Sequence, residues 1–195
     1  MPKVLGVGMN KTGTTTLAHA LRILGYAPQQ TYDLKATQKW ASGKTEELLD
    51  LYEDKIVFED FPWPLMYREF YSRYPDAHFI LTTRRSEEAW FNSLVKHAER
   101  TGPTEMRKLV YGHEMPIEDR EKHLAVYRNH NEEVRSFFEA KPEARFIEVC
   151  WEEGHGWPEL CTFLEQPVPE QPFPHMNAKP SLLRKWAKRL FYGKS

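Results

Sequence analysis

A glycine-rich segment near the N-terminus has the composition of a phosphate-binding loop. Its residues are Gly8-Met9-Asn10-Lys11-Thr12-Gly13-Thr14-Thr15-Thr16. Glycines let the backbone turn tightly and approach a ligand closely. The segment leads into an apolar-periodic stretch at 17–24, and the first N–H groups of a helix have no partner inside it and favour an anion. Because Lys11 adds a full positive charge and the threonines add hydroxyl donors, the segment predicts a phosphate site.

The order of residues in this loop differs from the Walker A pattern of nucleoside triphosphatases. That pattern places a lysine directly after the second glycine, and the next Ser or Thr binds Mg²⁺. Here Lys11 precedes Gly13, and Thr14 follows it. A lysine in the earlier position can reach the end of a 5′-phosphate chain without a metal ion. A small-molecule kinase that uses Mg-ATP remains an alternative, as does an ordinary glycine turn with an exposed lysine.

A second basic group follows the apolar run at 78–83. Arg84 and Arg85 stand where this run ends, and Ser93 comes eight positions after Arg85. An arginine at a strand end can bind a phosphate with two parallel hydrogen bonds. Ser93 reaches the same pocket only if its helix leans across the strand end. The alternative is a solvated basic strand end. A nucleotide with phosphates at both the 5′ and 3′ positions needs two such anion sites, whereas ATP needs one.

Two carboxylates, Glu59 and Asp60, follow the apolar run at 56–58. A carboxylate at a strand end that faces the phosphate loop can take a proton from a hydroxyl group. We therefore take Asp60 as the first candidate for a general base, Glu59 as the second and His19 as the third. The alternative for Asp60 is a capping role at the helix that begins at Pro62.

The elements that must position these residues alternate along the chain. Apolar runs predict the strands, and helical spacing of apolar residues predicts the helices. We expect strands at 4–8, 56–58, 78–83 and 145–150. We expect helices at 17–24, 33–50 with a break near Gly43, 62–74, 87–97, 116–138 and 157–164. Residues 101–115 contain two glycines and a proline and predict a mobile connection. Such alternation predicts an α/β fold with a mostly parallel sheet of about four to five strands, which binds ligands beyond the carboxyl ends of its strands.

Bulk composition fits one globular domain over residues 1–195. The chain is 41% hydrophobic with a formal net charge of −1, which excludes broad non-specific nucleic-acid binding. Its two cysteines make no disulfide framework. No secretory signal or membrane-spanning run is evident, so we expect a cytoplasmic protein. The eight histidines lack metal-ligand spacing, and we expect no metal.

Residues 181–195 predict a basic amphipathic helix that packs on its own domain, with contact to a membrane surface as the less favoured alternative.

The loop and the second basic group resemble those of sulfotransferases that use 3′-phosphoadenosine-5′-phosphosulfate (PAPS). The match covers Lys11-Thr12-Gly13-Thr14-Thr15-Thr16, and also Arg85 with Ser93 and the tryptophan before it. The segments 153–164 and 172–177 look like the ending of the same family, in particular its short bacterial, fungal and plant branch. Where that family often has Asp-Pro after the arginine, this chain has Ser86-Glu87.

This resemblance implies roles for particular residues. Lys11 would contact the phosphate that carries the sulfuryl group, and Thr12, Gly13, Thr14, Thr15 and Thr16 would hold the 5′-phosphate. Arg85, or Arg84 in its place, would bind the 3′-phosphate with Ser93. The branch carries an Asp-x-Pro that matches Asp60, and Asn177 and Lys179 would help to close the donor site. The implied partner is a small-molecule or carbohydrate acceptor, which residues 27–54 and 98–144 would enclose.

Overall fold

The computed structural model of the chain describes residues 1–174. Five parallel strands form one sheet in the order β2-β3-β1-β4-β5. The strands are β1 (Val4–Gly6), β2 (Gln29–Gln30), β3 (Val57–Phe58), β4 (His78–Thr82) and β5 (Arg145–Val149). This sheet confirms the predicted α/β class and its parallel strands.

Strand β1 lies at the centre of the sheet, which fixes what surrounds the loop that follows it. Val4 is in register with Val57 of β3 on one side and with His78 of β4 on the other. The carboxyl ends of these three strands therefore meet at one edge. This edge brings together the phosphate loop, the Glu59-Asp60 pair and the Arg84-Arg85 pair.

Eight α-helices occur within residues 1–174. They are α1 (Thr14–Ile23), α2 (Leu34–Ala41), α3 (Thr45–Leu51), α4 (Tyr67–Arg73), α5 (Glu87–Thr101), α6 (Glu105–Tyr111), α7 (Arg120–Glu139) and α8 (Trp157–Leu164). Short 3-10 helices cover Trp63–Met66, Pro116–Glu118 and Trp151–Glu153. In this described part of the chain, none of the helices has the length and apolarity that crossing a membrane requires.

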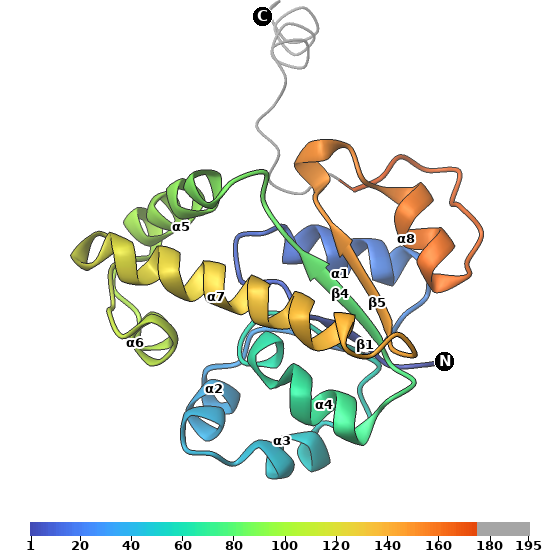
Figure 1. Cartoon of the computed structure of the whole chain (residues 1–195), viewed down its shortest axis with the longest axis horizontal. Helices are drawn as coiled ribbons and strands as arrows, with labels where there is room; N and C mark the ends of the chain where they lie inside the picture. The colour runs from blue at the N-terminus through green and yellow to red at the C-terminus, as the bar shows by residue number, and fades with distance from the viewer. Residues whose placement is uncertain (175–195) are drawn as a thin grey trace, which may run out of the picture.

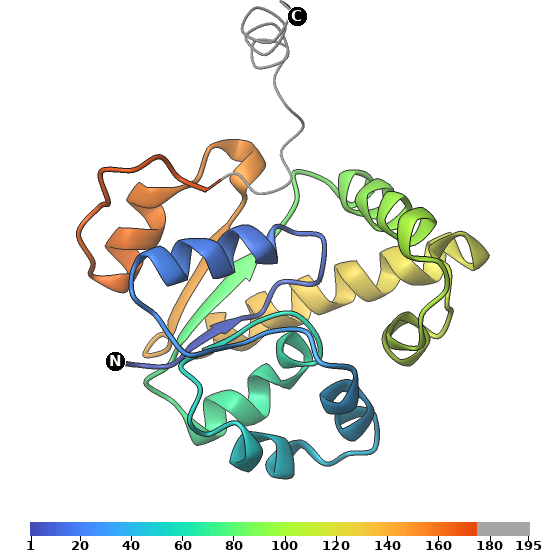
Figure 2. The same cartoon turned by 180° about the vertical axis from the view of Figure 1, so that it is seen from behind.

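The helices cover both faces of the sheet, as expected for parallel strands. Helices α4 and α7 lie on one face (Figure 1), and α1 and α8 lie on the other (Figure 2). The side chains of β4 alternate accordingly, because Phe79 packs toward α4 and α7 whereas Ile80 packs toward α1 and α8. Helices α5 and α6 extend beyond the sheet, and with α7 they enclose a third apolar cluster that includes Met9 of the loop and Phe61.

Sequence patterns predicted most helices, and local caps help to define where they begin. Ser86 accepts a hydrogen bond from the Ala89 amide at the start of α5, at 3.1 Å. The break near Gly43 separates α2 from α3. Helix α5 ends four residues later than expected, at Thr101. Residues 181–195, Asn177 and Lys179 lie outside the described residues, so the predictions made for them stay predictions.

Three local predictions were wrong. Residues 101–115, expected to be a mobile connection, contain α6, which Thr104 caps and in which Tyr111 is buried. The helix expected from residue 116 begins at Arg120, and Ile117 before it is 70% exposed in a 3-10 turn. Strand β2 was missed because its two glutamines give no apolar signal.

Candidate active site

The phosphate loop ends in a row of unsatisfied backbone donors. Gly13 caps α1 with a φ of 103°, a left-handed conformation that favours glycine. The first amide to bond back into the helix is that of Leu17, which donates to Gly13 O at 3.0 Å. Within residues 1–174, the amides of residues 13–16 donate to no protein acceptor. Four consecutive free N–H groups at a helix N-terminus form an anion-binding cradle.

Threonine hydroxyls hold the base of the loop against β4. Thr12 Oγ1 lies 2.6 Å from both Met9 O and Thr82 Oγ1. Gly8 leaves no room for a side chain, since a Cβ atom there would stand 2.8 Å from Thr82 N. Thr12 is therefore a structural residue of the loop, and its buried hydroxyl is already engaged.

Helices α5, α6 and α7 fix the other side of the loop through hydrogen bonds. The Trp90 indole donates to Asn10 O at 2.9 Å, and the Tyr111 hydroxyl donates to Asn10 Oδ1 at 2.8 Å. The His130 imidazole donates to Val7 O at 2.7 Å. These bonds place α5 and α6 directly beside Lys11.

Trp151 holds the loop at its last glycine. Its indole Nε1 donates to Gly13 O at 3.2 Å, and a Cβ atom on Gly13 would stand 2.7 Å from this nitrogen. Phe173 packs against the Trp151 ring at a centroid distance of 4.9 Å. The end of β5 and the chain after α8 thus support the anion cradle.

Lys11 and Asp60 share an unusual backbone conformation. Within residues 1–174, three residues other than glycine have positive φ: Lys11 (68°), Asp60 (61°) and Glu165 (55°). Glu165 ends a helix, where such a conformation is common. Lys11 and Asp60 end no helix, and strained residues of this kind cluster at functional sites.

Electrostatics links Lys11 to Asp60 across the site. Burial lowers the pKa of the Lys11 ammonium, and the charge of Asp60 partly opposes that shift. Burial raises the pKa of Asp60, and the Phe61 amide, which donates to Asp60 Oδ1 at 2.8 Å, and Lys11 partly oppose this shift. A lysine and a carboxyl group with pKa values displaced toward neutrality are suited to charge stabilisation and proton transfer.

Glu59 occupies a different environment from Asp60. Glu59 is 4% exposed, and within residues 1–174 its Oε2 atom has no hydrogen-bond partner. Burial, and then the charge of Asp60, raise the pKa of Glu59 well above its ordinary value. Glu59 therefore releases its proton less readily than an exposed glutamate does. His19 lies in the second turn of α1 and makes no hydrogen bond to Lys11 or Asp60.

The two arginines after β4 differ in what they contact. Arg84 Nη2 pairs with Glu152 Oε1 at 2.9 Å, whereas the exposed Arg85 contacts Glu152 only through its backbone amide, at 3.2 Å. In residues 1–174 the Arg85 guanidinium thus has no carboxylate partner. Ser93 is partly buried on α5, one turn after Trp90. Of the two guanidinium groups, that of Arg85 is thus the one without an ion pair, while the buried Arg84 Nε also has no hydrogen-bond partner in the described part of the chain.

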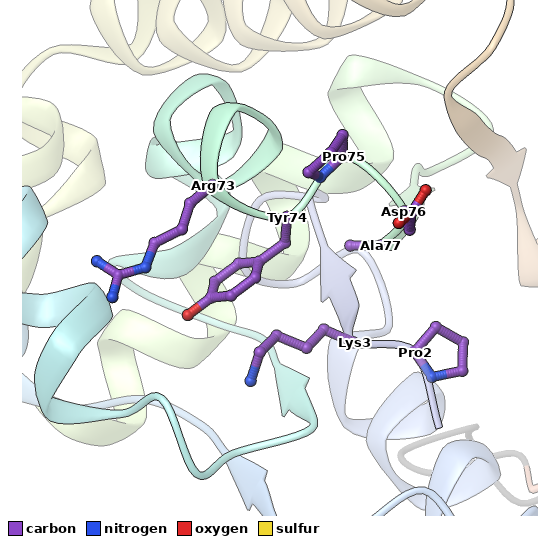
Figure 3. Close-up of a pocket in the computed structure, with 7 residues that line it drawn as sticks. All are labelled: Pro2, Lys3, Arg73, Tyr74, Pro75, Asp76 and Ala77. Atoms are coloured by element: carbon purple, nitrogen blue, oxygen red, sulfur yellow. The ribbon is translucent and has the colours of Figure 1, made fainter.

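Two cavities of the surface lie at opposite ends of the strands. One cavity of about 220 Å³ lies beside Lys3 and Tyr74 at the amino end (Figure 3). Another, of about 170 Å³, lies between α5 and α7 and is lined by Thr83 and Arg84, which follow β4 at the carboxyl end. Ligands of parallel sheets bind at the carboxyl ends of the strands, and there, within residues 1–174, the cradle amides and the Lys11 ammonium donate to no protein acceptor.

A family model described as "Sulfotransferase domain" matches residues 3–113 and 101–182. The chain belongs to this sulfotransferase family. A relative from Aspergillus versicolor, "Ava biosynthesis cluster protein M", is 27% identical over 216 residues, which cover 89% of this chain and 80% of the relative. The family assignment confirms the resemblance that the loop and the second basic group carried.

The structure brings some of the predicted site residues of this sulfotransferase together. Lys11, the amides of 13–16 and Asp60 meet at one edge of the sheet, with Arg85 at the neighbouring strand end. Sequence reasoning missed Tyr111 and Trp151, which hold the loop. The helical spacing of apolar residues around Tyr111 indicates a helix, but the glycines on either side suggested a mobile connection instead. The partnership of Trp151 with Gly13 spans 138 residues, and no local pattern reveals it.

Proposed function

We propose that the chain transfers a sulfuryl group from PAPS to a hydroxyl or amine group of a small-molecule or carbohydrate acceptor. The observation that carries this proposal is the free backbone cradle at residues 13–16 beside the unpaired Lys11. Membership of the sulfotransferase family supports the type of reaction. The available Arg85 beside the cradle supports a donor that carries phosphates at both the 5′ and 3′ positions.

The residues present fit such a donor. Amides at a helix N-terminus favour the 5′-phosphate, and the threonines of the first turn offer further donors. Lys11 would bind the phosphate that carries the sulfuryl group and stabilise the charge that develops there on cleavage. Arg85, supported by Ser93, would bind the 3′-phosphate with its fork of N–H donors.

Asp60 would act as the general base. In the transfer, the acceptor oxygen forms a bond to sulfur, the bond between sulfur and the leaving phosphate oxygen breaks, and the acceptor proton passes to the Asp60 carboxylate. Glu59 is the second candidate, and its raised pKa means that less of it is in the ionised form that a general base needs. Positioning and charge stabilisation would supply most of the rate, as in phosphoryl transfer.

Thermal stabilisation by nucleotides tests the donor. PAP, the 3′,5′-bisphosphate product, is compared with AMP and with Mg-ATP in wild type and in Arg85→Gln. A ligand at about 100 times its Kd stabilises the folded state by about 2.7 kcal/mol, a visible rise in Tm. We expect selective stabilisation by PAP that Arg85→Gln weakens. Equal or greater stabilisation by Mg-ATP, or activity that is lost in EDTA, would instead support the kinase.

We further propose that the protein acts in the cytoplasm without a metal ion and without nucleic-acid partners. Two cysteines that are buried and not bonded to each other support a reducing compartment. The net charge of −1 supports the exclusion of nucleic acid. Full activity in the presence of EDTA, and fractionation of the tagged protein with cytosolic markers, are the results expected.

A further inference from the structure

Basic side chains that the proposed reaction does not use lie beside the Lys11–Asp60 pair. They are His97 and Arg100 on α5 and Arg107 on α6. The charges of both arginines lower the pKa of Lys11, and after burial the charge of Lys11 is the largest influence that lowers the pKa of His97. These groups therefore share one electrostatic environment at the mouth of the site.

The backbone geometry explains this proximity. Trp90 on α5 bonds to Asn10, the neighbour of Lys11, at 2.9 Å. His97 and Arg100 follow Trp90 by seven and ten positions, which is about two and three helical turns, so they lie on the same side of α5. Tyr111 anchors α6 to Asn10 in the same way. Both helices thus present basic side chains toward Lys11.

Hydrogen bonds define which of these groups can bind a ligand. Arg100 Nη2 lies 3.0 Å from His97 Nδ1, and since a guanidinium can only donate, Nδ1 is the acceptor. The imidazole is then neutral and carries its proton on Nε2, in agreement with a pKa lowered to about 4 by burial and by the neighbouring cations. His97 therefore keeps one N–H donor, and Arg100 keeps several.

Arg107 contributes positive charge rather than contacts to a ligand, because its guanidinium is engaged within the protein. Its buried guanidinium donates to Glu114 O at 2.6 Å, to Gly102 O and to Thr101 Oγ1 at 3.3 Å. None of these acceptors is a carboxylate. In the described part of the chain, Lys11, Arg100 and Arg107 form no ion pair, so none of the three cations has a direct carboxylate partner.

We propose that the acceptor carries an anionic group, such as a carboxylate or a phosphate or sulfate ester, which Arg100 and the Nε2–H of His97 bind while the acceptor hydroxyl reaches Asp60. This inference rests on the proposed sulfuryl transfer, because it concerns the second substrate of the same site. An oxyanion could also come from the donor itself. The cradle at residues 13–16 and Lys11 already provide for the donor phosphate, which favours the acceptor as the source.

A paired acceptor panel tests the proposal. Phenols, primary alcohols, sterols and sugars are each assayed as a carboxylic acid and as its methyl ester, with PAP release from PAPS as the readout. We expect turnover to favour the acids. Arg100→Gln should raise KM for the acids about tenfold or more, the worth of a lost charge-assisted hydrogen bond, and leave KM for PAPS unchanged. Lys96→Gln, which removes an exposed charge from the same helix, is the matched control and should change neither constant.

Different outcomes separate this proposal from the proposed function. If the esters are used as well as the acids, or if no acid is a substrate, the anionic acceptor is wrong. A rise in KM for PAPS, or weaker PAP binding by calorimetry, in Arg100→Gln would assign the basic group to the donor and overturn the proposal as well. Absence of PAP binding to wild type would reject the sulfotransferase reaction itself.

Discussion

Lys3 and Lys11 lie at opposite ends of β1 and differ in whether the protein supplies acceptors for their ammonium groups. Lys3 precedes the strand, and its Nζ donates to Glu53 O at 2.7 Å and to Lys55 O at 2.6 Å. Lys11 follows the strand and, within residues 1–174, donates to no protein acceptor. Burial lowers the pKa of both. Burial alone therefore does not distinguish the two lysines, whereas the presence or absence of a protein acceptor does.

The cations around the two lysines also differ in whether they have partners. Figure 3 shows Lys3 beside Tyr74 and Arg73, and Lys3 Nζ lies 4.9 Å from the centre of the Tyr74 ring. Arg73 pairs with Asp50 at 2.6 Å. Each cation at that end has a partner. At the Lys11 end the free cradle and the unpaired cations leave positive potential for a ligand to neutralise.

Replacing each lysine by alanine is the most direct test of the difference between them. Lys11→Ala should lower kcat/KM about 1,000-fold, because it removes a charge aimed at the leaving phosphate. Lys3→Ala should keep its activity per folded molecule and lose about 1–2 kcal/mol of stability with its two hydrogen bonds. Steady-state kinetics and urea unfolding of both variants measure these effects. Unchanged kinetics in Lys11→Ala would refute the assigned role.

Replacing the two carboxylates at the end of β3 should likewise have different effects on activity. Asp60→Asn should lower kcat about 100-fold, the usual worth of a general base. A wild-type base must be ionised, so activity should fall as the pH drops through the raised pKa of Asp60. Glu59→Gln should leave this acidic limb in place. A limb that instead disappears in Glu59→Gln would make Glu59 the base.

Removal of one hydroxyl tests whether α6 positions the loop. Tyr111→Phe should weaken PAP binding several-fold, since it leaves Asn10 Oδ1 without its donor and frees the residue next to Lys11. Tyr74→Phe at the opposite edge is the control and should not alter PAP binding. Calorimetric titration of both variants provides the measurement. Equal affinities would mean that α6 only covers the loop.

The smallest effect concerns stability at Glu59. Its folded-state pKa lies above the unfolded value, so the folded state binds this proton more tightly. The corresponding stability is present below about pH 4.3 and is lost as the pH rises through the folded pKa. Glu59→Gln should therefore be more stable than wild type by about 1 kcal/mol near pH 8. Thermal scans from pH 4 to 8 should show this difference growing with pH.

The sequence was sufficient where a local pattern determines a local structure. The glycine loop, the Ser86 cap and the apolar run of β4 each carry their signal within a few residues. Partnerships across the chain gave no such signal. Glu152 pairs with Arg84 rather than with the Arg85 guanidinium, across 68 positions of the chain. The raised pKa of Glu59 depends on its burial in the folded protein. Helix α6 was missed because Gly102 and Gly112 suggested a loop, although they stand at its borders.

The anchors of the phosphate loop have a consequence for how the protein is made. The bonds to Trp90, Tyr111, His130 and Trp151 span 80, 101, 123 and 138 residues. Contacts over such separations form late, because the chain between them must first be ordered. During synthesis the loop leaves the ribosome 138 residues before Trp151, its last anchor. Nascent chains that end before this point should therefore lack affinity for the donor even when the core strands have formed.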